Sequence, residues 1–154
     1  MFKHVRTLDI RPRLPLSPAS AAVLLGDVLG LLLFIVWGLH SHGVAAWEVP
    51  EHTLVTLTPF LIAWLVLAPL FNLYHRETLL SYRRTLVFLV AGWVVISFVG
   101  GLIRASPFFD GGTGLTFLLV NIVFGSIILV PWRLAVVTVL RQVLPGRVTT
   151  GSVR

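Results

Sequence analysis

Four stretches of this chain, each about as long as a membrane is thick, contain almost no charged residues. They cover residues 19–39, 54–73, 85–103 and 115–140. A helix needs about 20 apolar residues to cross the hydrocarbon core of a bilayer, so each stretch is long enough to span it. In lipid every backbone polar group needs a partner within its own segment, which a helix provides. The sequence therefore predicts an all-α integral membrane four-helix bundle.

The composition points to the same class of protein. Of the 154 residues, 56% are hydrophobic and only 12% are charged, whereas a soluble domain has roughly 25% charged residues. We expect one transmembrane domain over residues 19–141, between a basic N-terminal segment at 1–18 and a polar tail at 142–154. The chain has no cysteine, which excludes disulfides and thiolate metal sites.

The basic residues lie on alternate sides of the four stretches. Lys3, Arg6, Arg11 and Arg13 precede the first stretch, Arg76, Arg83 and Arg84 separate the second from the third, and Arg141, Arg147 and Arg154 follow the fourth. The loop at 40–53 has no Lys or Arg. Cytoplasmic loops of membrane proteins carry the excess of Lys and Arg, so we expect a multi-pass protein of the cell membrane with both termini in the cytoplasm.

The net charge of +6 does not indicate a nucleic-acid-binding protein. Its basic residues flank the apolar stretches, and no nucleic-acid recognition motif occurs. The expected partner is the lipid bilayer, and no nucleic acid is predicted to bind.

Asp27 lies inside the first apolar stretch. A carboxylate at the bilayer centre costs about 2.5–3.5 kcal/mol on insertion scales, so such a group is paired, protonated or functional. Arg133, in the fourth stretch, is its best charged partner, and the two are candidates for an ion or proton site. The alternative is an Arg133 that extends to the lipid headgroups beside Trp132. We expect this second arrangement, with Asp27 neutral.

Ala22, Gly26 and Gly30 recur at intervals of four residues beside Asp27. Small residues at this spacing allow two helices to approach closely in lipid. The pattern predicts a helix contact, either within the chain or between copies in a homo-oligomer.

Three further residues suggest a pocket in the middle of the bundle. Trp64 and Trp93 fall near the centres of their stretches, where each indole N–H needs an acceptor. That acceptor could be Asp27, a carbonyl freed at a proline kink, or a ligand. Asn121 adds an amide in the fourth stretch, although such groups most often hydrogen-bond between helices. Close core packing is the alternative to a pocket.

No motif for metal or covalent chemistry is present. His40, His42, His52, Glu48 and Glu51 gather in and around one loop, but their spacing matches no metal-binding signature. Neither a Gly-x-Ser-x-Gly nor a His-Glu-x-x-His sequence occurs. We therefore predict no metal, no cofactor and no catalytic residue.

Short sequence elements along the chain match a known family. They are Gly26-Asp27-Val28-Leu29, Ser41-His42-Gly43, Pro59-Phe60-Leu61-Ile62-Ala63-Trp64, Ala68-Pro69, Leu102-Ile103-Arg104-Ala105, Asp110-Gly111-Gly112, Phe124-Gly125 and Pro131-Trp132-Arg133. With them the chain resembles the family called domain of unknown function 3054, small four-span membrane proteins of archaea and bacteria. The likeness covers Leu16 to Arg141. It implies a four-helix membrane fold, and it carries no activity, cofactor or catalytic residue.

These observations leave three hypotheses for function. The first is a permease-like or channel-like protein with Asp27 as its ion or proton site. The second is a non-catalytic membrane subunit or scaffold, in a homo-oligomer or a larger membrane complex. A lipid-modifying enzyme ranks third because no catalytic constellation is visible. A water-accessible cavity reaching Asp27 would favour transport, whereas burial against Arg133, Trp64 or Trp93 would favour a structural role.

Overall fold

The computed structural model describes residues 18–109 and 111–144, which fold into helices and contain no strand. The helices are α1 (Pro18–Ser41), α2 (Pro50–Leu70), α3 (Arg76–Leu79), α4 (Tyr82–Arg104) and α5 (Leu115–Val143). The basic N-terminal segment up to residue 17 and the tail from residue 145 onward, both predicted to be cytoplasmic, lie outside the described residues.

Four of these helices, α1, α2, α4 and α5, are long and apolar enough to cross a membrane. Their positions agree with the four apolar stretches of the sequence, which confirms an all-α protein with four membrane-capable helices. Large apolar side chains such as Leu33, Val66 and Val123 are exposed on the outside of the bundle. A surface this apolar is suited to contact with lipid and would be a liability in water.

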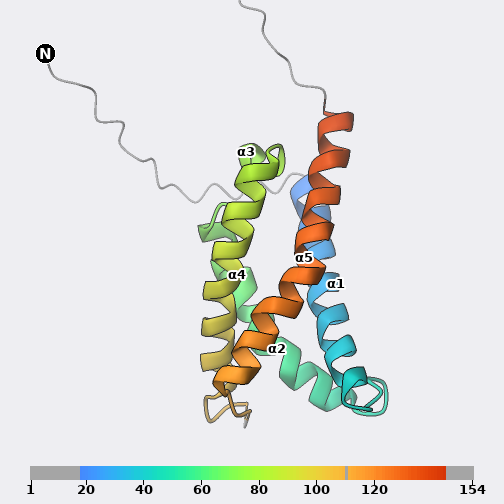
Figure 1. Ribbon diagram of the computed structural model, residues 1–154, viewed down its shortest axis with the longest axis vertical. Coiled ribbons are helices and arrows are strands. Elements are labelled where there is room, and N and C mark those ends of the chain that lie inside the picture. The colour runs from blue at the N-terminus through green and yellow to red at the C-terminus, as the bar shows by residue number, and fades with distance from the viewer. Residues whose placement is uncertain (1–17, 110, 145–154) are drawn as a thin grey trace, which may run out of the picture.

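The four long helices form a closed ring in the order α1, α2, α4, α5, with each helix packed against two neighbours. Figure 1 shows α3, the start of α1 and the end of α5 towards one end of the bundle. We call this the α3 end. The connecting residues 42–49, 105–109 and 111–114 lie at the opposite end, which we call the loop end.

The second helix ends earlier than the sequence predicts. The apolar stretch continues to Leu73, but α2 stops at Leu70 because Asn72 adopts a left-handed backbone conformation, with φ of 55°. Asn72 N–H then donates to the Pro69 carbonyl and Leu73 N–H to the Ala68 carbonyl, which is the Schellman pattern of a helix end. The chain turns at this point, so Leu73 and Tyr74 are buried in the bundle.

Aromatic side chains fill the middle of the bundle. The ring centroids of Trp64 and Trp93 are 5.9 Å apart, and Phe34 meets Trp93 edge-on at 6.5 Å. Gly125 makes room for this packing, since a Cβ atom there would collide with the Trp93 indole. We call Phe34, Trp93 and Trp64 the aromatic layer. It links α1, α4 and α2 across the interior.

Candidate functional site

Asp27 has 0% of its surface exposed and is surrounded by hydrogen-bond donors. Arg133 binds it through two parallel bonds, from Nε to Oδ1 at 2.9 Å and from Nη2 to Oδ2 at 2.6 Å. Trp132 Nε1 also donates to Oδ1, at 3.0 Å, and the Tyr74 hydroxyl donates to Oδ2, at 2.7 Å. Each carboxylate oxygen thus accepts two bonds, which fills the usual acceptor capacity of the group.

Arg133 is equally enclosed, with 1% of its surface exposed. Its remaining terminal nitrogen, Nη1, donates to the Leu73 carbonyl at 2.8 Å. The guanidinium carbon lies 5.0 Å from the centre of the Tyr74 ring, within range of a cation–π interaction. This one side chain therefore ties α5 both to α1 and to the turn that follows α2.

The expectation that Arg133 extends to the headgroups is wrong. The helix α5 continues past Arg133 to Val143, about 15 Å further along its axis. Within the bundle, Asp27 supplies a bidentate charged partner and Leu73 supplies a backbone acceptor. Bidentate carboxylate pairing is among the strongest contacts that a guanidinium can make.

Tyr74 connects the ion pair to the centre of the bundle. Trp64 Nε1 donates to the Tyr74 hydroxyl at 2.8 Å, and that hydroxyl donates onward to Asp27. Burial, and next the negative charge of Asp27, raise the pKa of Tyr74, so its hydroxyl keeps its proton and remains a donor. Sequence reasoning missed Tyr74 because it lies just beyond an apolar stretch. The signal was Asn72, a residue type that favours the left-handed conformation at helix ends.

Two of the three small residues on α1 lie against α5. A Cβ atom at Gly26 would overlap the Trp132 indole, and one at Gly30 would come within 3.4 Å of Leu129 Cδ2. In this chain the close contact is therefore intramolecular and lies beside Asp27. Ala22, the third of these residues, is exposed.

The predicted central pocket residues separate into two groups. Trp64 and Trp93 are fully buried, and the Trp93 N–H donates to the Ile122 carbonyl at 3.1 Å. Neither indole donates directly to Asp27 or lines the cavity described next. Asn121 does line that cavity. The pocket predicted from the sequence combined Asn121 with the two tryptophans.

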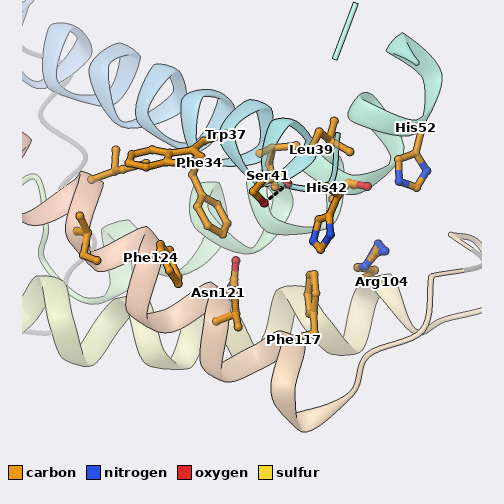
Figure 2. Close-up of a pocket in the computed structure, with 16 residues that line it drawn as sticks. Phe34, Trp37, Leu39, Ser41, His42, His52, Arg104, Phe117, Asn121 and Phe124 are labelled. Atoms are coloured by element: carbon orange, nitrogen blue, oxygen red, sulfur yellow. Dashed lines mark hydrogen bonds between the residues drawn. The ribbon is translucent and has the colours of Figure 1, made fainter. Parts of the chain in front are cut away.

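The cavity has a volume of about 380 Å³ and lies between α1, α2 and α5 towards the loop end. Figure 2 shows Asn121 on α5 pointing across it towards α1. Asn121 is only 1% exposed, yet both atoms of its amide lack a hydrogen-bond partner among the described residues, as does the hydroxyl of Thr56. At the outer end Arg104 joins His42 and His52 in the lining.

Among the described residues, no three His, Asp or Glu side chains gather as a metal ion would require. Of the three histidines near the loop end, His42 and His52 line the cavity, whereas His40 is not among its lining residues.

Comparison with known protein families gives a match over most of the chain. The family described as protein of unknown function (DUF3054) matches residues 24–136, a range that includes the Asp27–Arg133 pair, Tyr74 and the whole lining of the cavity. Among curated proteins and among solved structures, the comparison finds no significant match.

Proposed function

We propose that this chain, which belongs to the DUF3054 family of proteins of unknown function, is a non-catalytic membrane subunit or scaffold. One observation carries this proposal. Asp27, the single acidic group within the apolar stretches of the sequence, is 0% exposed and accepts four hydrogen bonds from protein donors. A carboxylate in this state stabilises a fixed arrangement of helices.

An ion or proton site has different requirements. A transported cation must reach the carboxylate and find a free acceptor position, and Asp27 has neither exposure nor a free position. The cation would also have to displace Arg133. Leaving one member of a buried ion pair without its partner costs roughly 3–5 kcal/mol, so replacement of Arg133 by a cation is unfavourable.

The distribution of surface charge supports the proposed orientation in the cell membrane. Arg76 in α3 and Arg83 and Arg84 at the start of α4 are all exposed, and Arg141 is exposed near the end of α5. An excess of arginine marks the cytoplasmic side of a membrane protein. We therefore place the α3 end and both termini in the cytoplasm. Reporter fusions at Arg154 and near Glu48 test this, and a cytoplasmic Glu48 loop would contradict it.

Reactivity of Asp27 towards dicyclohexylcarbodiimide tests the structural role. This reagent enters lipid and modifies carboxyl groups that it can reach in their protonated form. We expect Asp27 to remain unmodified in the full chain in lipid, as judged by mass spectrometry, and to become modified in Arg133→Gln. Trp132→Phe removes only one of the four donors and serves as a milder variant that keeps the ion pair. Rapid modification of the unaltered chain would contradict the proposal.

The permease-like reading is the second candidate, and a continuous series of contacts favours it. Phe34 lines the cavity and touches Trp93, which packs on Trp64; Trp64 donates to Tyr74, and Tyr74 donates to Asp27. The cavity and the ion pair are therefore connected through the aromatic layer. Transport would require this layer to open.

Proteoliposomes containing the pH-sensitive dye pyranine distinguish the two candidates. A scaffold should give the same proton leak as empty liposomes. A proton flux that Asp27→Asn abolishes while the fold remains intact would favour the permease-like reading.

A lipid-modifying enzyme remains the least favoured reading. Ser41 and His42 both line the cavity, but the Ser41 hydroxyl donates to the Gly38 carbonyl at 2.7 Å. A nucleophilic serine instead needs its hydroxyl to face a base.

A further inference from the structure

The amide of Asn121 is a buried group that faces a cavity and has neither of its polar atoms paired with a described residue. The side chain is almost completely enclosed, and neither its oxygen nor its nitrogen has a hydrogen-bond partner among the described residues. An unpaired buried polar group destabilises a fold, so each such group in a native protein requires an explanation. Because Asn121 points into a cavity (Figure 2), a ligand in that cavity would supply the missing partners.

The lining of the cavity changes from charged to apolar along its length. Figure 2 shows Arg104 and His42 towards one end, Asn121 in the middle, and Phe34 and Phe124 towards the other end. A molecule that fits this order has a polar end, an adjoining hydrogen-bonding group and an apolar chain. The volume of the cavity, about 380 Å³, is within the range of small-molecule sites, roughly 300–1,000 Å³.

Arg104 determines which charge we expect at the polar end of the ligand. The Arg104 guanidinium lies over the Phe117 ring at 5.0 Å, and its Nε is buried without a partner. Of the salt bridges among residues 18–109 and 111–144, none includes Arg104. Within the described part of the chain, no carboxylate lies at salt-bridge distance from this guanidinium. A guanidinium in this situation attracts an anion, and it repels a metal cation.

We propose that this cavity binds a single-chain amphipathic anion. Its negative group pairs with Arg104, a neighbouring amide or hydroxyl group exchanges hydrogen bonds with Asn121, and its apolar chain lies between Phe34 and Phe124. The acyl chain of a bulk phospholipid would fill only the apolar end and would leave Asn121 unpaired. The site does not depend on the proposed scaffold role, because Asp27 is not part of its lining.

Three matched probes test the site, with the full chain in nanodiscs of phosphatidylcholine. N-dodecanoylglycine has the carboxylate, the amide N–H and the apolar chain. N-dodecanoylsarcosine has an N-methyl group in place of the amide N–H, and dodecyltrimethylammonium has a cationic head in place of both the carboxylate and the amide. By equilibrium binding we expect the glycine compound to bind more tightly than the sarcosine compound, and the cation to bind at least about tenfold more weakly.

Variants connect this order to particular residues. Arg104→Gln should weaken the binding of N-dodecanoylglycine by about tenfold or more, whereas Arg104→Lys should retain part of the affinity. Asn121→Leu should abolish the preference for the glycine compound over the sarcosine compound. Arg83→Gln removes an exposed charge remote from the cavity, and Ser97→Ala removes a buried, unpartnered hydroxyl that does not line it. Neither control should change binding.

The same measurements include results that would contradict the proposed site. Equal binding of the three probes, or equal effects of Arg104→Gln and Arg83→Gln, would exclude an anion at Arg104. Competition by phosphatidylglycerol that depends on Arg104 would identify a lipid headgroup as the occupant in place of a single-chain anion. Without ligand, Asn121→Leu should raise the melting temperature, and a fall would mean that Asn121 has a structural role. Carbodiimide modification of Asp27 is measured separately, so failure of the scaffold proposal would not be confused with failure of this site.

Discussion

At the α3 end of the bundle, Asp27, Arg133 and Tyr74 have their polar groups paired with one another. Towards the loop end, by contrast, the amide of Asn121 and the hydroxyl of Thr56 have no hydrogen-bond partner within residues 18–109 and 111–144. Both regions are buried, so exposure does not explain the difference. Pairing within the protein stabilises a single arrangement of helices. Unpaired groups around a cavity lower the stability of the fold, but their hydrogen-bond donors and acceptors remain available to a ligand. Such a loss of stability is common at functional sites.

The largest expected effect is at the ion pair. Arg133→Gln and Asp27→Asn should each lower the free energy of unfolding by roughly 3–5 kcal/mol, because each leaves a buried partner without its counterpart. The double variant should lose much less than the sum of the two. Unfolding in lipid or mild detergent measures this coupling. Additive losses would show that the two residues act independently, and the contrast between the two ends would fail.

The next largest effect concerns the Tyr74 hydroxyl. Tyr74→Phe removes a donor to Asp27 and an acceptor for the Trp64 N–H, and should cost about 1–3 kcal/mol because both partners remain buried. Tyr82→Phe is the matched control, since the Tyr82 hydroxyl bonds Thr138 at an exposed position. Equal melting temperatures for the two variants would contradict a stabilising role for Tyr74.

A pair of glycine variants compares close packing with open space on the same helix. Gly26→Ala places a methyl group against the Trp132 indole, whereas Gly38→Ala meets no atom within 4 Å. Overpacking costs about 1–3 kcal/mol, so Gly26→Ala should lower the melting temperature and Gly38→Ala should not. If Gly26→Ala is neutral, Trp132 must rotate, and its bond to Asp27 would contribute little.

The smallest effect provides the most direct comparison of the two regions, because it uses the same substitution in each. Thr85, at the α3 end, donates to the Thr78 carbonyl at 2.6 Å, so Thr85→Val should cost about 1 kcal/mol. Thr56 lines the cavity, and its hydroxyl has no hydrogen-bond partner in the part of the chain that the structure describes, so Thr56→Val should be neutral or stabilising by up to about 1 kcal/mol. Melting temperatures in the same nanodiscs measure both, and losses of equal size would contradict the comparison.

The four helices could be predicted because hydrophobic length alone decides which segments cross a membrane. Their ends depend on individual residues. The helix α2 stops three residues before the end of its apolar stretch because Asn72 takes a left-handed conformation. That turn buries Tyr74, so a residue that resembles part of a loop in the sequence becomes a partner of Asp27.

The sequence also indicated that Asp27 needed a partner and that Arg133 was the best charged candidate. It could not determine whether Arg133 would turn inward, because that depends on how α1 and α5 pack at Gly26 and on where the Leu73 carbonyl lies. The unpaired amide of Asn121 could not be predicted either. A missing hydrogen bond is a property of the packed structure, and nothing in the residue order signals it.

The ion pair joins the first long helix to the last, and this affects how the protein is made. Asp27 and Arg133 are separated by 106 positions, so α1 is synthesised long before its partner exists. During that interval the first helix carries an acidic group with no counter-charge in the membrane, which is unfavourable until α5 arrives. Completion of the last helix is therefore the event that stabilises the first. A chain truncated before α5 should remain poorly inserted and sensitive to proteolysis. Through this ion pair, full-length chains should differ from truncated ones in their resistance to proteases.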